Sequence, residues 1–120
     1  MTECLLLTSW ADDVSKRDSR LMTDYYSDNA VLLATFENLL KGPVGIKKYF
    51  DSFLAKDRLV CEIIENYFLV NEASVQVCSG IYEFSYHEDN IQKKVLARYT
   101  FVIKNNKIIT HHSSVNPEFN

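Results

Sequence analysis

The second half of the chain constrains the fold most, because it consists of four long strand-like segments with little between them. The segments cover residues 59–70, 74–86, 94–104 and 107–114, and each is rich in β-branched and aromatic residues. The connections are short and polar, and the last is Asn105-Asn106, a residue type that tolerates the positive φ of tight hairpins. Strands joined by such short turns pair antiparallel. The sequence therefore predicts an antiparallel meander over residues 59–114.

Helical patterns dominate the first half of the chain. Leu6, Trp10 and Val14 recur every four residues within 2–17, which predicts a helix with one apolar face. The other elements expected here are a short second helix capped by Asp18 or Ser19, a strand over residues 30–36 and a third helix over residues 43–56. Helices ahead of a meander are typical of α+β domains. We expect residues 1–120 to form a single α+β domain, with three N-terminal helices packed on a curved antiparallel sheet that encloses a pocket.

Charge and hydropathy argue against two classes of partner. The net charge is −3 and the lysines occur singly or in pairs, so no basic stripe indicates nucleic-acid binding. The longest apolar run near the start covers residues 4–7, far short of the roughly 20 residues of a membrane span, and no basic region precedes it as in a secretory signal. We expect Cys4, Cys61 and Cys78 to be reduced structural thiols. These features predict a cytoplasmic protein that binds neither nucleic acid nor membrane.

The last strand-like segment is the most polar of the four and holds two of the three histidines. Strict alternation gives it one face made of Ile108, Thr110, His112 and Ser114. Because Ile108 suits the interior, we expect Thr110, His112 and Ser114 to face the pocket. A shift of one residue would turn His111 and Ser113 inward instead. The same polar residues would also suit an edge or interface strand.

Arg98 lies in the middle of a nearly apolar segment, residues 95–103. A charge buried without a partner is costly, so Arg98 needs either a carboxylate side chain or an anionic ligand. The side-chain candidates are Glu62, Glu65 and Glu83. The ligand would be a carboxylate or bicarbonate, because the guanidinium fork matches planar oxyanions. The residues alone leave both alternatives open.

Hydroxyl groups complete the expected pocket. Thr35 ends the first strand, Tyr49 lies near the apolar stripe of the third helix, and Tyr99 follows Arg98. Hydroxyls and one neutral imidazole can position water or a small polar substrate. Adjacent histidines on a strand point to opposite faces and cannot chelate one metal together. The sequence has no phosphate-binding glycine loop and no nucleophile elbow. A single histidine with hydroxyls would also make a poor zinc site, so we expect no cofactor, with a divalent metal as the alternative.

Several motifs resemble one branch of the NTF2-like superfamily, in the same order along the chain. They are Trp10, residues 30–35, 49–55, 80–84 and 97–101, the sequence His111-His112-Ser113-Ser114, and Pro117-Glu118. This branch, with its SnoaL-like cone fold, is shared by the calcium/calmodulin-dependent kinase II association domain and the iota-class carbonic anhydrases. The resemblance covers nearly all 120 residues. Two departures are Asn106 or Lys107 where the class has a tryptophan, and the lack of a visible targeting signal.

The resemblance implies a homodimer or larger homo-oligomer formed through the outer sheet face. It also implies reversible hydration of carbon dioxide to bicarbonate, which some members of the class carry out without a metal. Carried over, Thr35, Tyr49, His112 and Ser114 would hold the attacking water and the bicarbonate oxygens. Arg98, Thr110 and Tyr99 would bind the substrate. The general base stays open.

Two rival functions remain at this stage. One is a non-enzymatic association module that oligomerises through its sheet and binds a small anion through Arg98. The other is a SnoaL-type isomerase or cyclase, which needs an inward acid or base that the sequence does not make obvious.

Overall fold

The computed structural model of the protein describes residues 4–35 and 37–117. Thr2, at the start of the expected first helix, Phe36, at the end of the expected strand, and Glu118, in the last motif, lie outside these residues. The described elements, in chain order, are α1 (Leu5–Val14), α2 (Ser19–Thr23), β1 (Tyr26–Leu33), β2 (Leu39–Lys41), α3 (Gly42–Phe53), β3 (Asp57–Asn71), β4 (Val75–Glu88), β5 (Ile91–Lys104) and β6 (Lys107–Val115).

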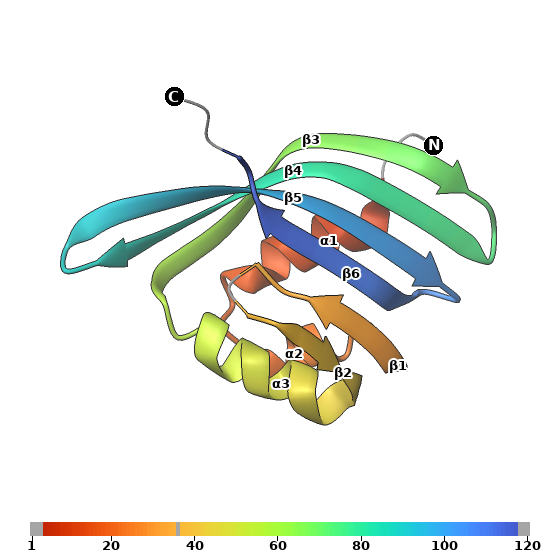
Figure 1. The fold of residues 1–120 in the computed structure, drawn as a ribbon, viewed down its shortest axis with the longest axis horizontal. Helices are drawn as coiled ribbons and strands as arrows, with labels where there is room; N and C mark the ends of the chain where they lie inside the picture. The colour runs from red at the N-terminus through yellow and green to blue at the C-terminus, as the bar shows by residue number, and fades with distance from the viewer. Residues whose placement is uncertain (1–3, 36, 118–120) are drawn as a thin grey trace.

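The strands form one curved sheet in the order β2-β1-β6-β5-β4-β3. The pairings β3–β4, β4–β5 and β5–β6 are antiparallel, which confirms the predicted meander, while β1 joins β6 in parallel. Figure 1 shows the helices gathered on one side of the sheet, which remains open, with β2 and β3 as its edges. α1 packs on β3, and α3 packs on β1. No described helix is long and apolar enough to cross a membrane.

The α+β class, the curved sheet and the place of α3 after the first strand agree with the expectation, but the description of three helices ahead of the sheet does not. Both β1 and the unpredicted β2 precede α3, and α2 has only five residues. β2 was not predicted, because three residues are too few to show strand periodicity. β1 begins at Tyr26, earlier than expected, and contains the polar residues 27–29 within an irregular stretch of its pairing with β6.

Aromatic side chains fill the space between α1 and the sheet. Trp10 is fully buried on the inner face of α1. Its indole stacks on the Tyr82 ring at a centroid separation of 5.8 Å and meets the Phe101 ring edge-on at 5.3 Å. Such contacts add to the hydrophobic gain of burying large rings. The helix periodicity read from the sequence thus places Trp10 at the centre of the core.

A close backbone approach links β3 and β4. The pairing of β3 with β4 is irregular between Ile63 and Glu65. A Cβ atom on Gly80 would lie 2.0 Å from the Glu65 carbonyl oxygen, so only glycine fits there. The single hydrogen of the Tyr99 hydroxyl is shared between this carbonyl oxygen, 2.9 Å from the hydroxyl oxygen, and Asn66 Oδ1, 2.8 Å from it.

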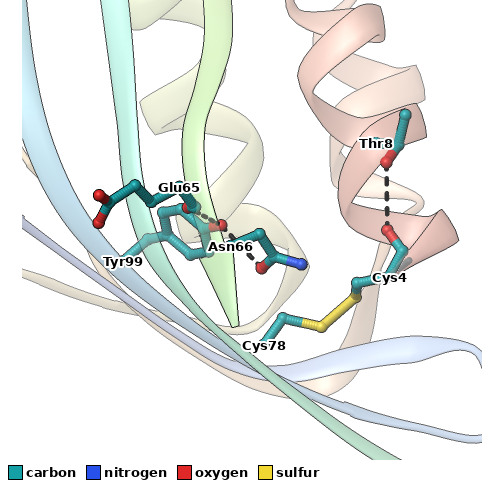
Figure 2. Close-up of a disulfide and its surroundings, with 6 residues drawn as sticks. All are labelled: Cys4, Thr8, Glu65, Asn66, Cys78 and Tyr99. Atoms are coloured by element: carbon teal, nitrogen blue, oxygen red, sulfur yellow. Dashed lines mark hydrogen bonds between the residues drawn. A yellow bond between two sulfur atoms is a disulfide. The ribbon is translucent and has the colours of Figure 1, made fainter. Parts of the chain in front are cut away.

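A disulfide joins Cys4, directly before α1, to Cys78 on β4 (Figure 2). The prediction of three reduced thiols is therefore wrong for these two residues, and Cys61 is the free, buried cysteine of the described chain. The two bonded cysteines are 74 residues apart, and sequence spacing alone gave no sign that the fold brings them together. Disulfides persist mainly in oxidising environments, so this bond does not support a cytoplasmic location, which stays a prediction.

Candidate active site

The β6 strand turns its polar side chains to the opposite faces from those expected. Ile103 pairs with Ile108, whereas Val102 pairs with Thr110, so Ile109 is an extra residue in a bulge. The bulge shifts the alternation by one residue. His111 and Ser113 are buried, at 2% and 5% exposure, and both Ile108 and His111 face the interior. The predicted inward orientation of Thr110, His112 and Ser114 is therefore wrong.

Six buried or half-buried side chains form an unbranched hydrogen-bonded series, which we call the polar series. Its members, in order, are Trp10, Tyr26, His111, Tyr82, Ser113 and Thr35. The distances are 3.2 Å from Trp10 Nε1 to the Tyr26 hydroxyl, 2.8 Å from that hydroxyl to His111 Nδ1, 3.0 Å from His111 Nε2 to the Tyr82 hydroxyl and 2.6 Å from that hydroxyl to Ser113 Oγ. Ser113 Oγ bonds to Thr35 Oγ1. The series begins on α1, passes through β1, β6 and β4, returns to β6, and ends at Thr35, just after β1.

A small internal cavity lies at the Thr35 end of the polar series. It leaves about 10 Å³ for the centre of a water molecule, which is close to the minimum for holding one water. Polar groups come from Thr35, Tyr49, Tyr82, His111 and Ser113, and the remaining walls are aromatic or aliphatic. No carboxylate is among these lining residues. The structure therefore brings together Thr35 and Tyr49, which were predicted as site residues, and places His111 and Ser113 beside them in the same cavity.

Burial keeps the polar groups of the cavity uncharged. Desolvation lowers the pKa of His111 to about 3, with the neighbouring His112 adding a smaller effect in the same direction. Desolvation also raises the pKa values of the Tyr26, Tyr49 and Tyr82 hydroxyls well above their usual range. At neutral pH the cavity presents a neutral imidazole and intact hydroxyls. The Phe101 ring stacks on His111 at a centroid separation of 3.9 Å and fixes the plane of the imidazole.

The other predicted residues lie on the outer face of the sheet. Arg98 is exposed there and pairs across strands with Ser114, while Thr100 pairs with His112. These four residues, with Glu65 and Tyr67 among others, line an open hollow of about 540 Å³. The expectation of a buried Arg98 is therefore wrong, because its strand has one solvent-facing side. Within residues 4–35 and 37–117, Arg98 forms no ion pair, and Glu83 lies instead 4.0 Å from Lys94.

Thr110 and Tyr99 also fall outside the cavity. Thr110 lies on the outer face beyond the bulge, between Val31 and Val102. Tyr99 faces inward, but its hydroxyl is already bonded to the β3 backbone and Asn66. Within the described chain, no three His, Cys, Asp or Glu side chains gather closely enough to hold a metal ion.

The sequence interpretation missed Trp10 and Tyr26 as members of the site and counted Tyr82 only as one of several tyrosine hydroxyls. Each of the three carries one polar atom on a large apolar ring. A buried Trp or Tyr needs a partner for that atom, which is the signal that could have pointed to a shared network.

Comparison with solved structures identifies the relatives of this arrangement. A candidate calcium/calmodulin-dependent protein kinase II association domain from Xanthomonas campestris is 31% identical, with a TM-score of 0.86, and the match covers 95% of this chain and 85% of that one. The chain belongs to the NTF2-like association-domain family. No family model and no curated protein match it.

More distant NTF2-like proteins share only the fold with this chain. A candidate dehydratase from Streptomyces avermitilis is 12% identical, with a TM-score of 0.82 over 95% of this chain and 93% of that one. A ketosteroid isomerase-like protein from Erwinia carotovora atroseptica is 11% identical, with a TM-score of 0.76 and the same coverage. Since these names span different activities, the function has to be argued from the cavity.

Proposed function

We propose that the protein is a carbonic anhydrase of the iota type, which hydrates carbon dioxide to bicarbonate at the inner cavity once side-chain movement widens it beyond the space of one water molecule. The observation that carries this proposal is the convergence of Thr35, Tyr49, His111 and Ser113 on one small cavity. These are the residue types expected from the resemblance, with His111 and Ser113 in the places first given to His112 and Ser114. The absence of a carboxylate in this lining argues against the acid–base chemistry of isomerases and cyclases of this fold.

The reaction adds a water oxygen to the carbon of carbon dioxide and releases one proton, giving bicarbonate. Negative charge develops on the former carbon dioxide oxygens, and hydroxyl donors fixed in a site that excludes water stabilise that charge. Thr35 and Tyr49 are placed to supply such donors. Both ring nitrogens of His111 are bonded to tyrosine hydroxyls, so His111 positions Tyr82 and Ser113. We propose no cofactor and no required metal.

Stopped-flow carbon dioxide hydration by metal-stripped protein tests the proposal. Thr35→Val and Ser113→Ala should each lower kcat/KM by about tenfold or more, because removing one fixed donor costs at least that in comparable sites. The doubled motif supplies matched controls, since His112→Ala and Ser114→Ala change the same residue types on the outer face. Hydration no faster than buffer, with or without added zinc, would refute the assignment, and so would equal losses in the control variants.

The second candidate is an association module whose outer sheet face joins two copies and binds a small anion. The favouring observation is Arg98, which is exposed beside His112 and Ser114 in the outer hollow and has no ion pair among the described residues. Tyr67 in this hollow is 58% exposed, and Leu96, on the same side of β5 as Arg98, is 40% exposed. Apolar groups around a cation suit a sheet-to-sheet contact between copies.

Sedimentation velocity tests association through this face, and the hydration assay separates this candidate from the first. The wild-type protein should sediment as a dimer or larger oligomer, and Tyr67→Lys and Leu96→Lys should give monomers. Val44→Lys is the control, since Val44 is 84% exposed on α3, outside the outer hollow. Bicarbonate binding lost in Arg98→Ala, in a protein without hydration activity, would favour the module. A wild-type monomer would refute association through this face.

A further inference from the structure

The direction of the hydrogen bonds in the polar series can be worked out from the donors and acceptors that each side chain carries. The indole N–H of Trp10 can only donate, so the Tyr26 hydroxyl oxygen accepts from it. The Tyr26 hydroxyl has one hydrogen of its own, and its other partner is His111 Nδ1 at 2.8 Å. The question is which of these two atoms donates to the other.

Burial decides this question. Tyr26 is 5% exposed, and the described residues offer its hydroxyl hydrogen no acceptor besides His111 Nδ1. If Nδ1 carried a proton and donated it, the Tyr26 oxygen would accept two hydrogen bonds and its own hydrogen would be left buried without a partner. A buried donor without an acceptor is more costly than any other arrangement of these groups. Tyr26 therefore donates, and Nδ1 accepts.

The remaining bonds follow from this first one. A neutral imidazole that accepts at Nδ1 carries its proton on Nε2, and burial keeps His111 neutral. Nε2–H then donates to the Tyr82 hydroxyl, which donates to Ser113 Oγ, which donates to Thr35 Oγ1. Every donor in the series is used except the last one. That donor is the Thr35 hydroxyl, which is half-buried and lines the cavity.

We propose that the polar series runs in one direction, from Trp10 to Thr35, with His111 held as the Nε2–H tautomer and the Thr35 hydroxyl as its free donor to the cavity. Tyr26 and Tyr82 are positioning residues, because each donates its only hydroxyl hydrogen within the series and keeps none for a ligand. The ligand of Thr35 is an oxygen acceptor, and its assignment as a bicarbonate oxygen rests on the proposed function. Hydrogen bonds aligned in one direction also polarise one another, which strengthens the terminal donor.

Nitrogen NMR of protein labelled with ¹⁵N in histidine tests the tautomer at neutral pH without any measurement of activity. The signals of His111 should show a protonated Nε2 and an unprotonated Nδ1. In Tyr26→Phe the Nδ1 atom loses its donor and becomes an unpaired acceptor, so its ¹⁵N signal should move to that of an unprotonated nitrogen without a hydrogen bond, while Nε2 stays protonated. Thr35→Val is the matched control, since the far end of the series loses its hydroxyl and the Nε2–H tautomer should persist.

Three results would overturn the proposal: a wild-type Nδ1–H tautomer, tautomers averaged in the wild type, or a Tyr26→Phe spectrum in which the Nδ1 signal is unchanged. Bicarbonate, used as the probe, should shift the His111 signals of the wild type but not those of Thr35→Val, and equal shifts in both would contradict the donor role of Thr35. A correct tautomer in a protein without hydration activity would leave the direction of the polar series standing while the carbonic anhydrase assignment fails.

Discussion

Gly80 shows how one residue can fix the shape of a sheet. The irregular pairing of β3 places the Glu65 carbonyl where any side chain at position 80 would have to start. The Tyr99 hydroxyl donates to the same carbonyl and would lie 2.9 Å from the added Cβ atom. A glycine at position 80 therefore allows β3 and β4 to approach this closely, and it leaves room for the hydrogen bond of the Tyr99 hydroxyl.

Gly80→Ala should lower the free energy of unfolding by about 2 kcal/mol or more, because the added methyl group forces apart two backbones that are paired along their length. Urea unfolding followed by Trp10 fluorescence measures the change. Gly45→Ala is the matched control, since a Cβ atom there meets nothing within 4 Å and the residue lies inside α3. Alanine in that helix should stabilise the protein by about 0.5–1 kcal/mol. Equal stability of the two variants would contradict the clash.

At the scale of elements, the sequence predicted the features that follow from side-chain periodicity within one segment. It missed the features that depend on how one strand pairs with the next. The four strands of the meander and the apolar face of α1 follow from repeated side-chain types along one segment. The bulge at Ile109 leaves no mark in the sequence, because Ile108 and Ile109 are the same residue and only the partner strand shows which one is extra. Thr35 and Tyr49 line the inner cavity, and neither position depends on the register of β6, while their roles stay predictions.

The disulfide ties the start of α1 to the middle of the sheet, and reducing it should destabilise the protein. Closing a loop between residues 74 apart restricts the unfolded chain, which contributes up to about 4 kcal/mol in the chain-entropy treatment. Cys4→Ser in the oxidised protein should therefore unfold at lower urea concentration, whereas Cys61→Ala should respond to reductant as the wild type does. A thiol titration should find one free thiol in the unfolded, unreduced wild type. Three free thiols would show that the bond is absent.

For the whole molecule, the neutral interior makes stability depend on pH. Unfolding exposes His111 to water, where its pKa returns to 6.5, while in the folded protein the pKa is about 3. Between these two values the unfolded state binds one more proton than the folded state. The free energy of unfolding therefore falls as the pH falls through this range, and it is insensitive to His111 above about 6.5.

This dependence should amount to about 1.4 kcal/mol per pH unit once the pH is clearly below 6.5. Urea midpoints measured at pH 7, 6 and 5 give the slope. His111→Gln removes the titrating group and should flatten the curve, although the variant will start from a lower stability. His112→Gln, on the outer face, should retain the wild-type slope. A wild-type slope no steeper than that of His111→Gln would show that His111 is not held neutral by burial.

The doubled sequence His111-His112-Ser113-Ser114 has a consequence for how an error in strand alignment would be tolerated. A β-strand shows alternate residues on each side, so this sequence presents one histidine and one serine to the interior and another histidine and serine to the exterior. If the bulge disappeared and Ile109 took a regular place in the strand, the two pairs would exchange places, and the interior would still receive an imidazole and a hydroxyl. Both faces of this strand therefore carry the same two residue types. A change of register would turn different residues inward, but it would leave the chemistry of the interior unchanged.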